Sequence, residues 1–200
     1  MARIIFFDVE TRKWAKDLHD DEQVGWDKLR RGEGGASAIC LYDTRDNWAY
    51  MYDDHSAKQA AQHLETADLV VGFSSRDFDI PVIEGLIGRK LQLKMTYDIC
   101  VTVFKANADR GLVGRKGEFT LDAISKRNLG RGKINHGSNA KKLAQTGQWG
   151  KLFNYCMDDV HLTRDLFARI CKTGGLNSLN GTFLTLPPLP EWIAASMAQE

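Results

Sequence analysis

The sequence contains no paired cysteine motif, no long apolar run and almost no net charge. Its four cysteines, at positions 40, 100, 156 and 171, are never spaced as Cys-x-x-Cys, which argues against a zinc site or a disulfide framework. No apolar segment approaches the roughly 18 residues of a membrane-spanning helix. The apolar run at the N-terminus, preceded by a single Arg, is too short for a signal peptide. We therefore expect a cytoplasmic protein that does not enter a membrane.

The net charge of +1 conceals an uneven distribution. Residues 101–151 carry eleven Lys or Arg and three Asp or Glu, a net charge of +8, whereas the rest of the chain carries −7. A basic segment on an acidic scaffold is typical of a protein that binds an anionic polymer such as nucleic acid. A solvated, glycine-rich loop would have the same composition, so charge alone does not decide between the two.

The length of 200 residues, with 43% hydrophobic and 26% charged residues, suits one domain with a substantial core. We expect this domain to span residues 1–172. Gly174 and Gly175 then end the last long helix, and the segment 187–190, Pro-Pro-Leu-Pro, precedes a short terminal helix. Residues 173–200 are therefore predicted to form a C-terminal tail, either a linker or a docking arm.

Residues 4–11 are predicted to form a buried central strand that ends in two carboxylates. Four apolar residues lead into Asp8 and Glu10, and side chains two apart on a strand point to the same face. Two carboxylates about 4 Å apart repel by roughly 4 kcal/mol at an effective dielectric constant of 20. We therefore expect a positive charge beside them. The alternative is that both acids are solvated at the strand end.

Alternating apolar residues and turn signals predict the other strands of an α/β fold. Residues 36–43 and 47–53 flank the turn signal at 43–46 and form a predicted hairpin, so the first three strands are expected to be antiparallel neighbours. Residues 69–73 are a continuous apolar run typical of a strand between parallel neighbours. Another short strand is expected to end at residues 97–100. The prediction is a mixed sheet of about five strands flanked by helices.

Helix signals separate these strands. Ser56 is predicted to cap a helix that runs to about residue 66. Asp79 is predicted to cap a helix of about residues 82–87; a cap leaves the second carboxylate oxygen free, so Asp79 can also bind a metal. The charged connection 12–35 is expected to be a long loop with at most one helical turn. Further helices are expected at about residues 101–107, 120–128 and 138–146.

The last long helix, predicted for residues 149–172, places one carboxylate toward the core. Asp159 lies beside an apolar stripe at helical spacing, whereas Asp158 lies in the opposite polar row, where a solvated acid is expected. A buried carboxylate is unfavourable unless it is paired or coordinated, so Asp159 requires a partner. Tyr155 lies one turn earlier on the same side. It is either an ordinary core aromatic or part of the same site.

Three short motifs occur in order along the chain. They are Asp8-Val9-Glu10 on the first strand, Phe78-Asp79 before a helix, and Tyr155 four residues before Asp159 on the late helix. Together they resemble the DEDD superfamily of 3′-to-5′ exonucleases, the DnaQ-like branch of the ribonuclease H-like fold. The Tyr resembles the DEDDy subgroup, in particular stand-alone domains similar to the proofreading exonuclease of family B polymerases. Residues 119–124 and 130–133 also resemble that family.

The resemblance implies a ribonuclease H-like fold over about residues 1–172 and a metal-dependent 3′-to-5′ exonuclease. Its substrate would be single-stranded DNA, or RNA, with a free or frayed 3′ end. Asp8, Glu10, Asp79 and Asp159 would hold two divalent cations, Mg²⁺ or Mn²⁺, because carboxylate oxygens suit these hard ions. Tyr155 would orient the attacking water. The residues expected to contact nucleic acid are Thr11, Ser74, Phe78, Lys133, Lys141 and Lys142.

The pattern departs from the family at Ser74, where the second motif usually has Asn, so a contact made by that amide would be weaker here. Two acids compete in each later motif, at 77 and 79 and at 158 and 159. The aromatic before Asp79 and the inward row of Asp159 favour those two. A structure-specific endonuclease would use the same four acids, and a non-catalytic nucleic-acid-binding module would not need them. The sequence identifies no protein partner.

Overall fold

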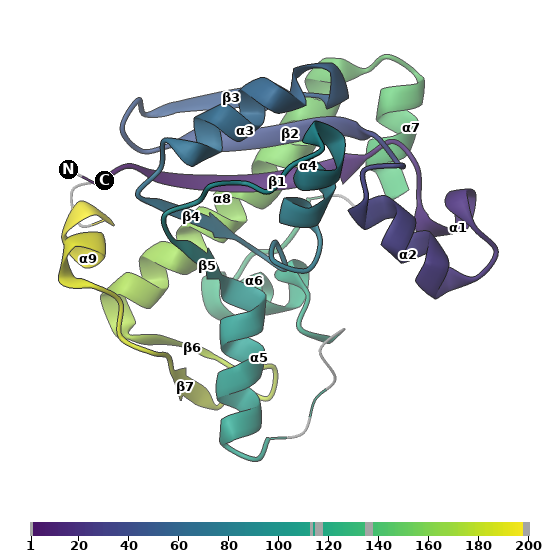
Figure 1. Ribbon diagram of the computed structural model, residues 1–200. Coiled ribbons are helices and arrows are strands. Elements are labelled where there is room, and N and C mark those ends of the chain that lie inside the picture. Colours follow the sequence, from purple (N-terminus) through teal and green to yellow (C-terminus); the bar gives the residue numbers. More distant parts are fainter. Residues whose placement is uncertain (1, 113, 115–117, 135–137, 198–200) are drawn as a thin grey trace.

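A five-stranded mixed sheet forms the centre of the molecule (Figure 1). The computed structural model describes residues 2–112, 114, 118–134 and 138–197. Arg115 and Lys116 of the predicted basic segment lie outside the described residues. The strand order is β3-β2-β1-β4-β5, so the N-terminal strand lies in the middle. The strands are β1 (Ile4–Thr11), β2 (Ala36–Asp43), β3 (Trp48–Tyr52), β4 (Leu69–Gly72) and β5 (Thr96–Asp98).

The pairing directions confirm the predicted sheet. β1 is antiparallel to β2 and β2 is antiparallel to β3, whereas β1, β4 and β5 run parallel. β4 pairs only with Ile4 to Phe6, so the second half of β1 extends beyond β4. The register with β2 shifts between Glu10 and Thr11. The two carboxylates of β1 therefore lie near the carboxyl end of the strand, beyond the part of β1 that pairs with β4.

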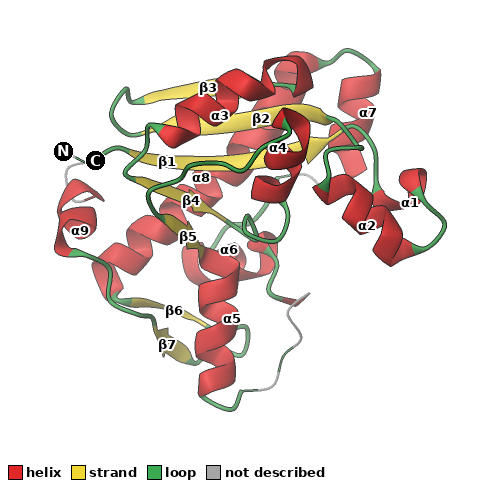
Figure 2. Cartoon of the chain, in the orientation of Figure 1, coloured by secondary structure: helices red, strands yellow, loops and turns green. Residues whose placement is uncertain are grey.

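Helices cover both faces of the sheet (Figure 2). A 3₁₀ turn, η1 (Asp54–Ser56), precedes α3, and a second, two-stranded sheet follows α8. That small sheet consists of β6 (Gly175–Asn177) and β7 (Phe183–Thr185). The helices are α1 (Ala15–Leu18), α2 (Glu22–Arg30), α3 (Ala57–Glu65), α4 (Asp79–Ile87), α5 (Ile99–Asp109), α6 (Leu121–Leu129), α7 (Ser138–Gln145), α8 (Trp149–Thr173) and α9 (Glu191–Met197).

Alternation along β1 divides the core into two layers. Ile5 and Phe7 pack in the layer of α3 and α4, whereas Ile4 and Phe6 pack in the layer of α8. The ring of Phe6 meets that of Phe167 on α8 edge to face, with centroids 5.8 Å apart. Because side chains alternate on a strand, Asp8 and Glu10 continue the α8 face of β1. The strand and the helix thereby bring their carboxylates together.

The structure corrects three local predictions. Asp79 does not cap α4 but is its first residue, and its side chain accepts a hydrogen bond from the backbone of Val9 on β1. Ser56 makes no side-chain cap for α3; instead its backbone N–H and hydroxyl both donate to the carboxylate of Asp53. The connection 12–35 forms two helices, α1 and α2, rather than a loop. For Asp79 and Ser56, the side chain expected to cap a helix forms a hydrogen bond outside that helix instead.

The C-terminal segment packs on α8 rather than extending away from it. Leu176, Leu184 and Ile193 are fully buried in the same core layer as α8. The backbone N–H of Ala2 donates to Ser196 on α9 at 3.2 Å, so the two ends of the described chain meet, as Figure 1 shows. Within the described ranges, none of the helices has the combination of length and apolarity that crossing a membrane requires.

Candidate metal and nucleic-acid site

Three carboxylates converge between β1 and α8. Asp8 and Glu10 come from the carboxyl end of β1, and Asp159 comes from the middle of α8. One oxygen from each lies within 4.8 Å of the others. Asp159 is only 2% exposed, as the helical spacing predicts, whereas Asp8 and Glu10 are partly exposed. The cluster is therefore open to solvent from the side of the strand.

Asp79 joins this cluster from the beginning of α4. Its Oδ1 accepts the N–H of Val9 at 2.9 Å, at a point where β1 has passed the end of β4. The side chain is buried, and the charge of Asp8 acts on it. One carboxylate oxygen is therefore fixed to the strand, which orients the carboxyl group beside Asp8. The exposed neighbour Asp77 lies at the surface instead.

Burial raises the pKa values of all four acids, and the charges of neighbouring acids raise those of Glu10, Asp79 and Asp159 further. Burial is the largest cause in each case. The charges of Asp8 and Asp159 raise the pKa of Glu10 further, and burial with the charge of Asp8 raises the pKa of Asp159 to about 7. Carboxylates held together in this way are stabilised in their charged form by a bound cation. The electrostatics of the cluster thus favour a positive charge at its centre.

Lys133 supplies one such charge. Its Nζ lies 2.5 Å from Oδ2 of Asp159. Burial alone would lower the pKa of Lys133, but the charges of Asp159, Asp8 and Glu10 raise it above its ordinary value. The backbone N–H of Lys133 donates to Asp122 at 2.9 Å, which anchors the loop after α6. The side chain expected to hold phosphate therefore points at the acids.

Tyr155 lies one turn before Asp159 with its ring in the core. The residue is 6% exposed, and among the described residues its buried hydroxyl has no hydrogen-bond partner. Burial, followed by the charges of Glu10 and Asp159, raises the pKa of Tyr155 far above its usual value. The hydroxyl therefore remains protonated and is available to donate a hydrogen bond near the acids. The residue Tyr155 also lines a cavity of about 500 Å³ beside α7 and α8, whose wall includes Lys142 and Lys151.

The donor set fits a hard divalent cation. Three carboxylates with oxygens within 4.8 Å of one another, and Asp79 beside them, offer oxygen ligands only. Mg²⁺ and Mn²⁺ are bound by such oxygens, whereas zinc prefers His and Cys. Asp8, Glu10, Asp79 and Asp159 are therefore the residues that would hold the ion.

In each of two other acidic clusters an arginine pairs with two of the acids, whereas among the described residues Lys133 forms its ion pair with Asp159 alone in the cluster of β1 and α8. Asp43, Asp46 and His63 bring ligand atoms within 4.8 Å, but Arg3 bonds Asp43 and Asp46. The acids at 53 and 54 likewise pair with the guanidinium of Arg12. Since an arginine stays charged at all ordinary pH values, we interpret both clusters as structural ion pairs.

Three of the other residues expected to contact nucleic acid make contacts with residues outside the acid cluster. The hydroxyl of Thr11 donates to the carbonyl of Lys13, and Phe78 meets Trp26 edge to face at 5.8 Å. Lys141 pairs with Asp17 at 2.5 Å.

Ser74 and Lys142 occupy separate places. Ser74 adopts the left-handed region with φ of 61°, and its N–H donates to Asp98. Lys142 is exposed on the wall of the cavity near Tyr155. Of the six residues, Lys133 is therefore the one that the structure pairs with an acid of the cluster.

Sequence reasoning missed two residues that support the site. The thiol of Cys156 lies 3.5 Å from Oδ2 of Asp8, and no pattern in the sequence indicates that contact. Asp98 accepts the N–H groups of Ser74 and Arg76, which fixes the loop before Asp79. Its position at a predicted strand end, directly before a helix, was a usable capping signal. Asp98 indeed also caps α5 through Val101.

Comparison with known proteins supports the fold. No protein-family model matches the sequence, and no curated protein sequence matches it. Among solved structures, the chain is similar to the family B DNA polymerase from the hyperthermophilic archaeon Pyrobaculum calidifontis, with a TM-score of 0.58 and 13% sequence identity. The similarity covers 85% of this chain but only 24% of the polymerase. The mixed five-stranded sheet with its flanking helices is a ribonuclease H-like fold.

Proposed function

We propose that this chain is a metal-dependent 3′-to-5′ exonuclease of the DEDDy type that hydrolyses phosphodiester bonds in single-stranded nucleic acid. The observation that carries the proposal is the convergence of Asp8, Glu10 and Asp159 within 4.8 Å, with Asp79 oriented beside them. The similarity of the fold to a DNA polymerase supports nucleic acid as the substrate class. Carboxylates held this closely do not stabilise the fold by themselves, because a positive charge must offset their mutual repulsion.

The four acids would hold two divalent cations, Mg²⁺ or Mn²⁺. Bound there, the ions would lower the pKa of a water molecule and stabilise charge on the leaving oxygen. The remaining roles belong to the chain itself. Val9 orients Asp79 through its backbone N–H, and the thiol of Cys156 contacts Asp8. These contacts preorganise the carboxylates, so less rearrangement is needed when the substrate binds.

Lys133 and Tyr155 complete the proposed machinery. The ammonium of Lys133, 2.5 Å from Asp159, holds that carboxylate in a fixed orientation. The hydroxyl of Tyr155 stays protonated because burial and the neighbouring acids disfavour its ionised form. It can therefore donate a hydrogen bond that orients the attacking water toward the phosphorus. Lys142 and Lys151, on the wall of the adjoining cavity, are placed to attract phosphates of the strand.

The direct test is digestion of 5′-labelled single-stranded DNA and RNA with and without Mn²⁺. An exonuclease shortens the strand into a descending ladder, and a 3′-phosphate suppresses the ladder. Cleavage of a closed circular single strand would instead identify an endonuclease. No cleavage of any strand at millimolar Mn²⁺ would contradict both.

A matched pair of variants tests whether the acids hold metal. Asp159→Asn removes a cluster carboxylate, whereas Asp158→Asn changes the adjacent acid, which accepts a hydrogen bond from Ile134. Mn²⁺ should raise the melting temperature of the wild type and of Asp158→Asn, because ligands that bind only the folded state stabilise it. The shift should be much smaller for Asp159→Asn. Equal shifts of the melting temperature in all three proteins would mean that the ion binds outside the acid cluster.

A further inference from the structure

The segment that joins β7 to α9 contains all but one of the prolines of the chain. Residues 186–190 read Leu-Pro-Pro-Leu-Pro and belong to neither a helix nor a strand. A proline ring fixes φ at about −65°, and the residue before a proline is restricted to extended or polyproline conformations. Every residue of this segment is either a proline or the residue before one. The covalent structure therefore favours a polyproline II helix over the whole segment.

The exposure of the segment follows the threefold period of such a helix. A polyproline II helix has three residues per turn, so its side chains form three rows. Leu186 and Leu189 share one row: Leu186 is 4% exposed, and Leu189 packs partly buried against the core layer of α8. The other two rows contain Pro187 with Pro190, and Pro188, and all three prolines are exposed. The leucine row therefore anchors the segment, and the three prolines form a surface feature that we call the proline ridge.

Hydrogen bonds hold both ends of the proline ridge. The N–H of Leu186 donates to the carbonyl of Gly174 at 3.0 Å, and the carbonyl of Pro190 accepts the N–H of Ile193 on α9 at 2.9 Å. Ile193 itself is fully buried. A segment that is already ordered loses little conformational entropy when a partner binds it. The ridge is thus preorganised as a ligand.

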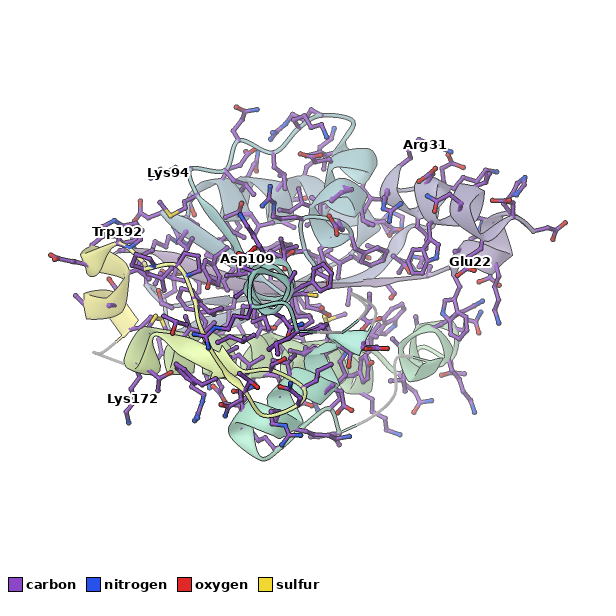
Figure 3. All side chains as sticks on the ribbon, turned by 90° about the horizontal axis from the view of Figure 1, so that it is seen from below. Glu22, Arg31, Lys94, Asp109, Lys172 and Trp192 are labelled. Atoms are coloured by element: carbon purple, nitrogen blue, oxygen red, sulfur yellow. The ribbon has the colours of Figure 1, made fainter. Side chains whose placement is uncertain are left out.

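The proline ridge lies on the far side of the molecule from the acid cluster. Trp192 follows the ridge near the start of α9, whereas Glu22 and Arg31 mark the ends of α2, which comes after the carboxyl end of β1. Figure 3 shows Trp192 and these two residues on opposite sides, and Figure 1 shows the same separation of α9 from α2. A partner on the ridge would therefore leave the carboxyl end of β1 uncovered.

A basic pocket adjoins the first proline of the ridge. It has a volume of about 520 Å³, and its wall includes Pro187 and one face of α5. Its cations are Arg76, Lys105 and Arg110, and its acid is Asp109. The three cations are exposed, and none of them forms an ion pair within the part of the chain that the structure describes. The pocket therefore carries positive charge that acidic groups of a partner can complement.

The combination of the two surfaces favours a protein partner over nucleic acid. Phosphates would suit the basic pocket, but proline side chains carry no charge and no hydrogen-bond donor, so the ridge offers nothing to a phosphate backbone. Proteins recognise polyproline helices with grooves that are lined by aromatic side chains. A groove of that kind with acidic side chains at its rim matches both the ridge and the pocket.

We propose that the proline ridge and the adjoining basic pocket bind a protein domain that has an aromatic-lined groove bordered by acidic side chains. The exposed prolines fill the groove, and Arg76, Lys105 and Arg110 face its acidic rim. The proposal does not depend on the proposed function, because neither surface contains an acid of the cluster. It makes the C-terminal segment a docking site on the folded domain.

Anisotropy titrations of the full chain into labelled polyproline-binding domains test the ridge. The probes are isolated WW domains and SH3 domains, chosen with acidic and with neutral groove rims. The ridge variant combines Pro187→Ala and Pro188→Ala and keeps both leucines. Pro81→Ala is the control, because it removes the remaining proline of the chain, on α4. A domain with an acidic rim should bind the wild type, and the ridge variant should weaken that binding about tenfold. Pro81→Ala should bind like the wild type, and thermal melting checks that each variant is folded.

Charge reversal tests the basic pocket separately. Lys105→Glu combined with Arg110→Glu should weaken binding of the acidic-rim domain about tenfold at low salt, and added salt should reduce the difference. The control combines Arg45→Glu and Lys58→Glu, which change the net charge equally at exposed positions in the turn after β2 and on α3. It should bind the domain like the wild type. The same proteins are titrated with a labelled single-stranded DNA in EDTA.

Several results would overturn the proposal. They are the absence of binding by every domain of the panel at millimolar concentration, equal binding of the ridge variant and the wild type, and an effect of charge reversal on DNA alone. The last result would identify the pocket as a phosphate site. Digestion of a 5′-labelled strand in Mn²⁺ by the ridge variant should match the wild type, so a failure of docking and a failure of catalysis are separate results.

Discussion

Asp158 and Asp159 are adjacent in the chain, yet α8 places them in different electrostatic surroundings. Asp159 is buried against Lys133, and its pKa is raised to about 7, while Asp158 accepts a backbone N–H at the rim of a cavity. A rotation of one residue along the helix thus separates an acid of the cluster from one outside it. The role of each acid depends on the direction of its side chain, because the helix sends neighbouring side chains to different faces.

Tyr155→Phe tests the role of one hydroxyl. The change keeps the ring and removes a buried group that has no hydrogen-bond partner among the described residues, so folding stability should be unchanged or slightly higher. Turnover should fall by about a hundredfold if that hydroxyl positions water. Single-turnover digestion in Mn²⁺ measures the effect.

Tyr97→Phe is the matched control. Tyr97 also has a buried hydroxyl, but its pKa is raised to about 12 mainly by burial, with no contribution from the acid cluster among its causes. Its turnover should stay at the wild-type level. Equal turnover in Tyr155→Phe and wild type would return Tyr155 to the role of a core aromatic.

Asp43 provides a pH-dependent contribution to stability. Burial would raise its pKa, but hydrogen bonds from His63 and Arg3 outweigh burial and lower it to about 2. A carboxyl group with a lowered pKa in the folded state stabilises the protein above its unfolded pKa of about 3.9 and loses this contribution as the pH falls toward 2. The contribution amounts to about 2 kcal/mol.

The measurement is urea unfolding between pH 5 and pH 2. Wild type should lose more unfolding free energy over this interval than Asp43→Asn, by about 2 kcal/mol. Other carboxylates with lowered pKa values, such as Asp54 and Asp68, contribute to both proteins alike. Parallel curves for the two proteins would mean that Asp43 ionises equally easily in the folded and unfolded states.

At the scale of elements, the sequence predicted the strands and helices that depend on residues close together in the chain. The apolar run that leads into two carboxylates in residues 4–11 identified the central strand, and the apolar row of α8 identified the inward acid and the long helix. The connection 12–35 has no comparable apolar period, so α1 and α2 were not predicted. Their positions depend on contacts with other elements, such as the close approach of Gly25 to Ala15. Asp79 was misassigned as a cap for the same reason, because its partner Val9 lies 70 positions away.

Gly25→Ala tests the contact between α1 and α2. Ala normally favours a helix over Gly by up to about 1 kcal/mol. Here the new Cβ would lie 2.3 Å from the backbone oxygen of Ala15, so α1 must move. We expect a net loss of about 1–3 kcal/mol in unfolding free energy. Gly150→Ala is the control, since a Cβ there meets no atom within 4 Å and should be neutral or stabilising. Equal stability changes in the two variants would show that α1 shifts at no cost.

At the scale of the whole molecule, the charge asymmetry read from the sequence has a structural counterpart. Several basic residues of the 101–151 segment surround the site, and they have separate partners. Lys133 binds Asp159 and Lys141 binds Asp17, so neither ammonium group is fully available to replace a counterion at a phosphate of the strand. Lys142 and Lys151 are exposed on one cavity wall near Tyr155. Charge counting identified the segment, but only the fold distinguishes internal ion pairs from candidate phosphate contacts.

This distinction predicts the salt dependence of binding. Each phosphate contact on a single strand contributes about 0.7 to the slope of log affinity against log salt. Replacing Lys142 and Lys151 together by Gln should therefore reduce the slope by about 1.4. The control replaces Lys58 and Lys172, which are exposed on α3 and at the far end of α8. It removes the same net charge from the molecule away from the cavity. Anisotropy titrations of a labelled single strand in EDTA, from low to moderate salt, supply both slopes. If the two double variants change the slope equally, then the strand responds to the net charge of the molecule and not to contacts at the cavity beside Tyr155.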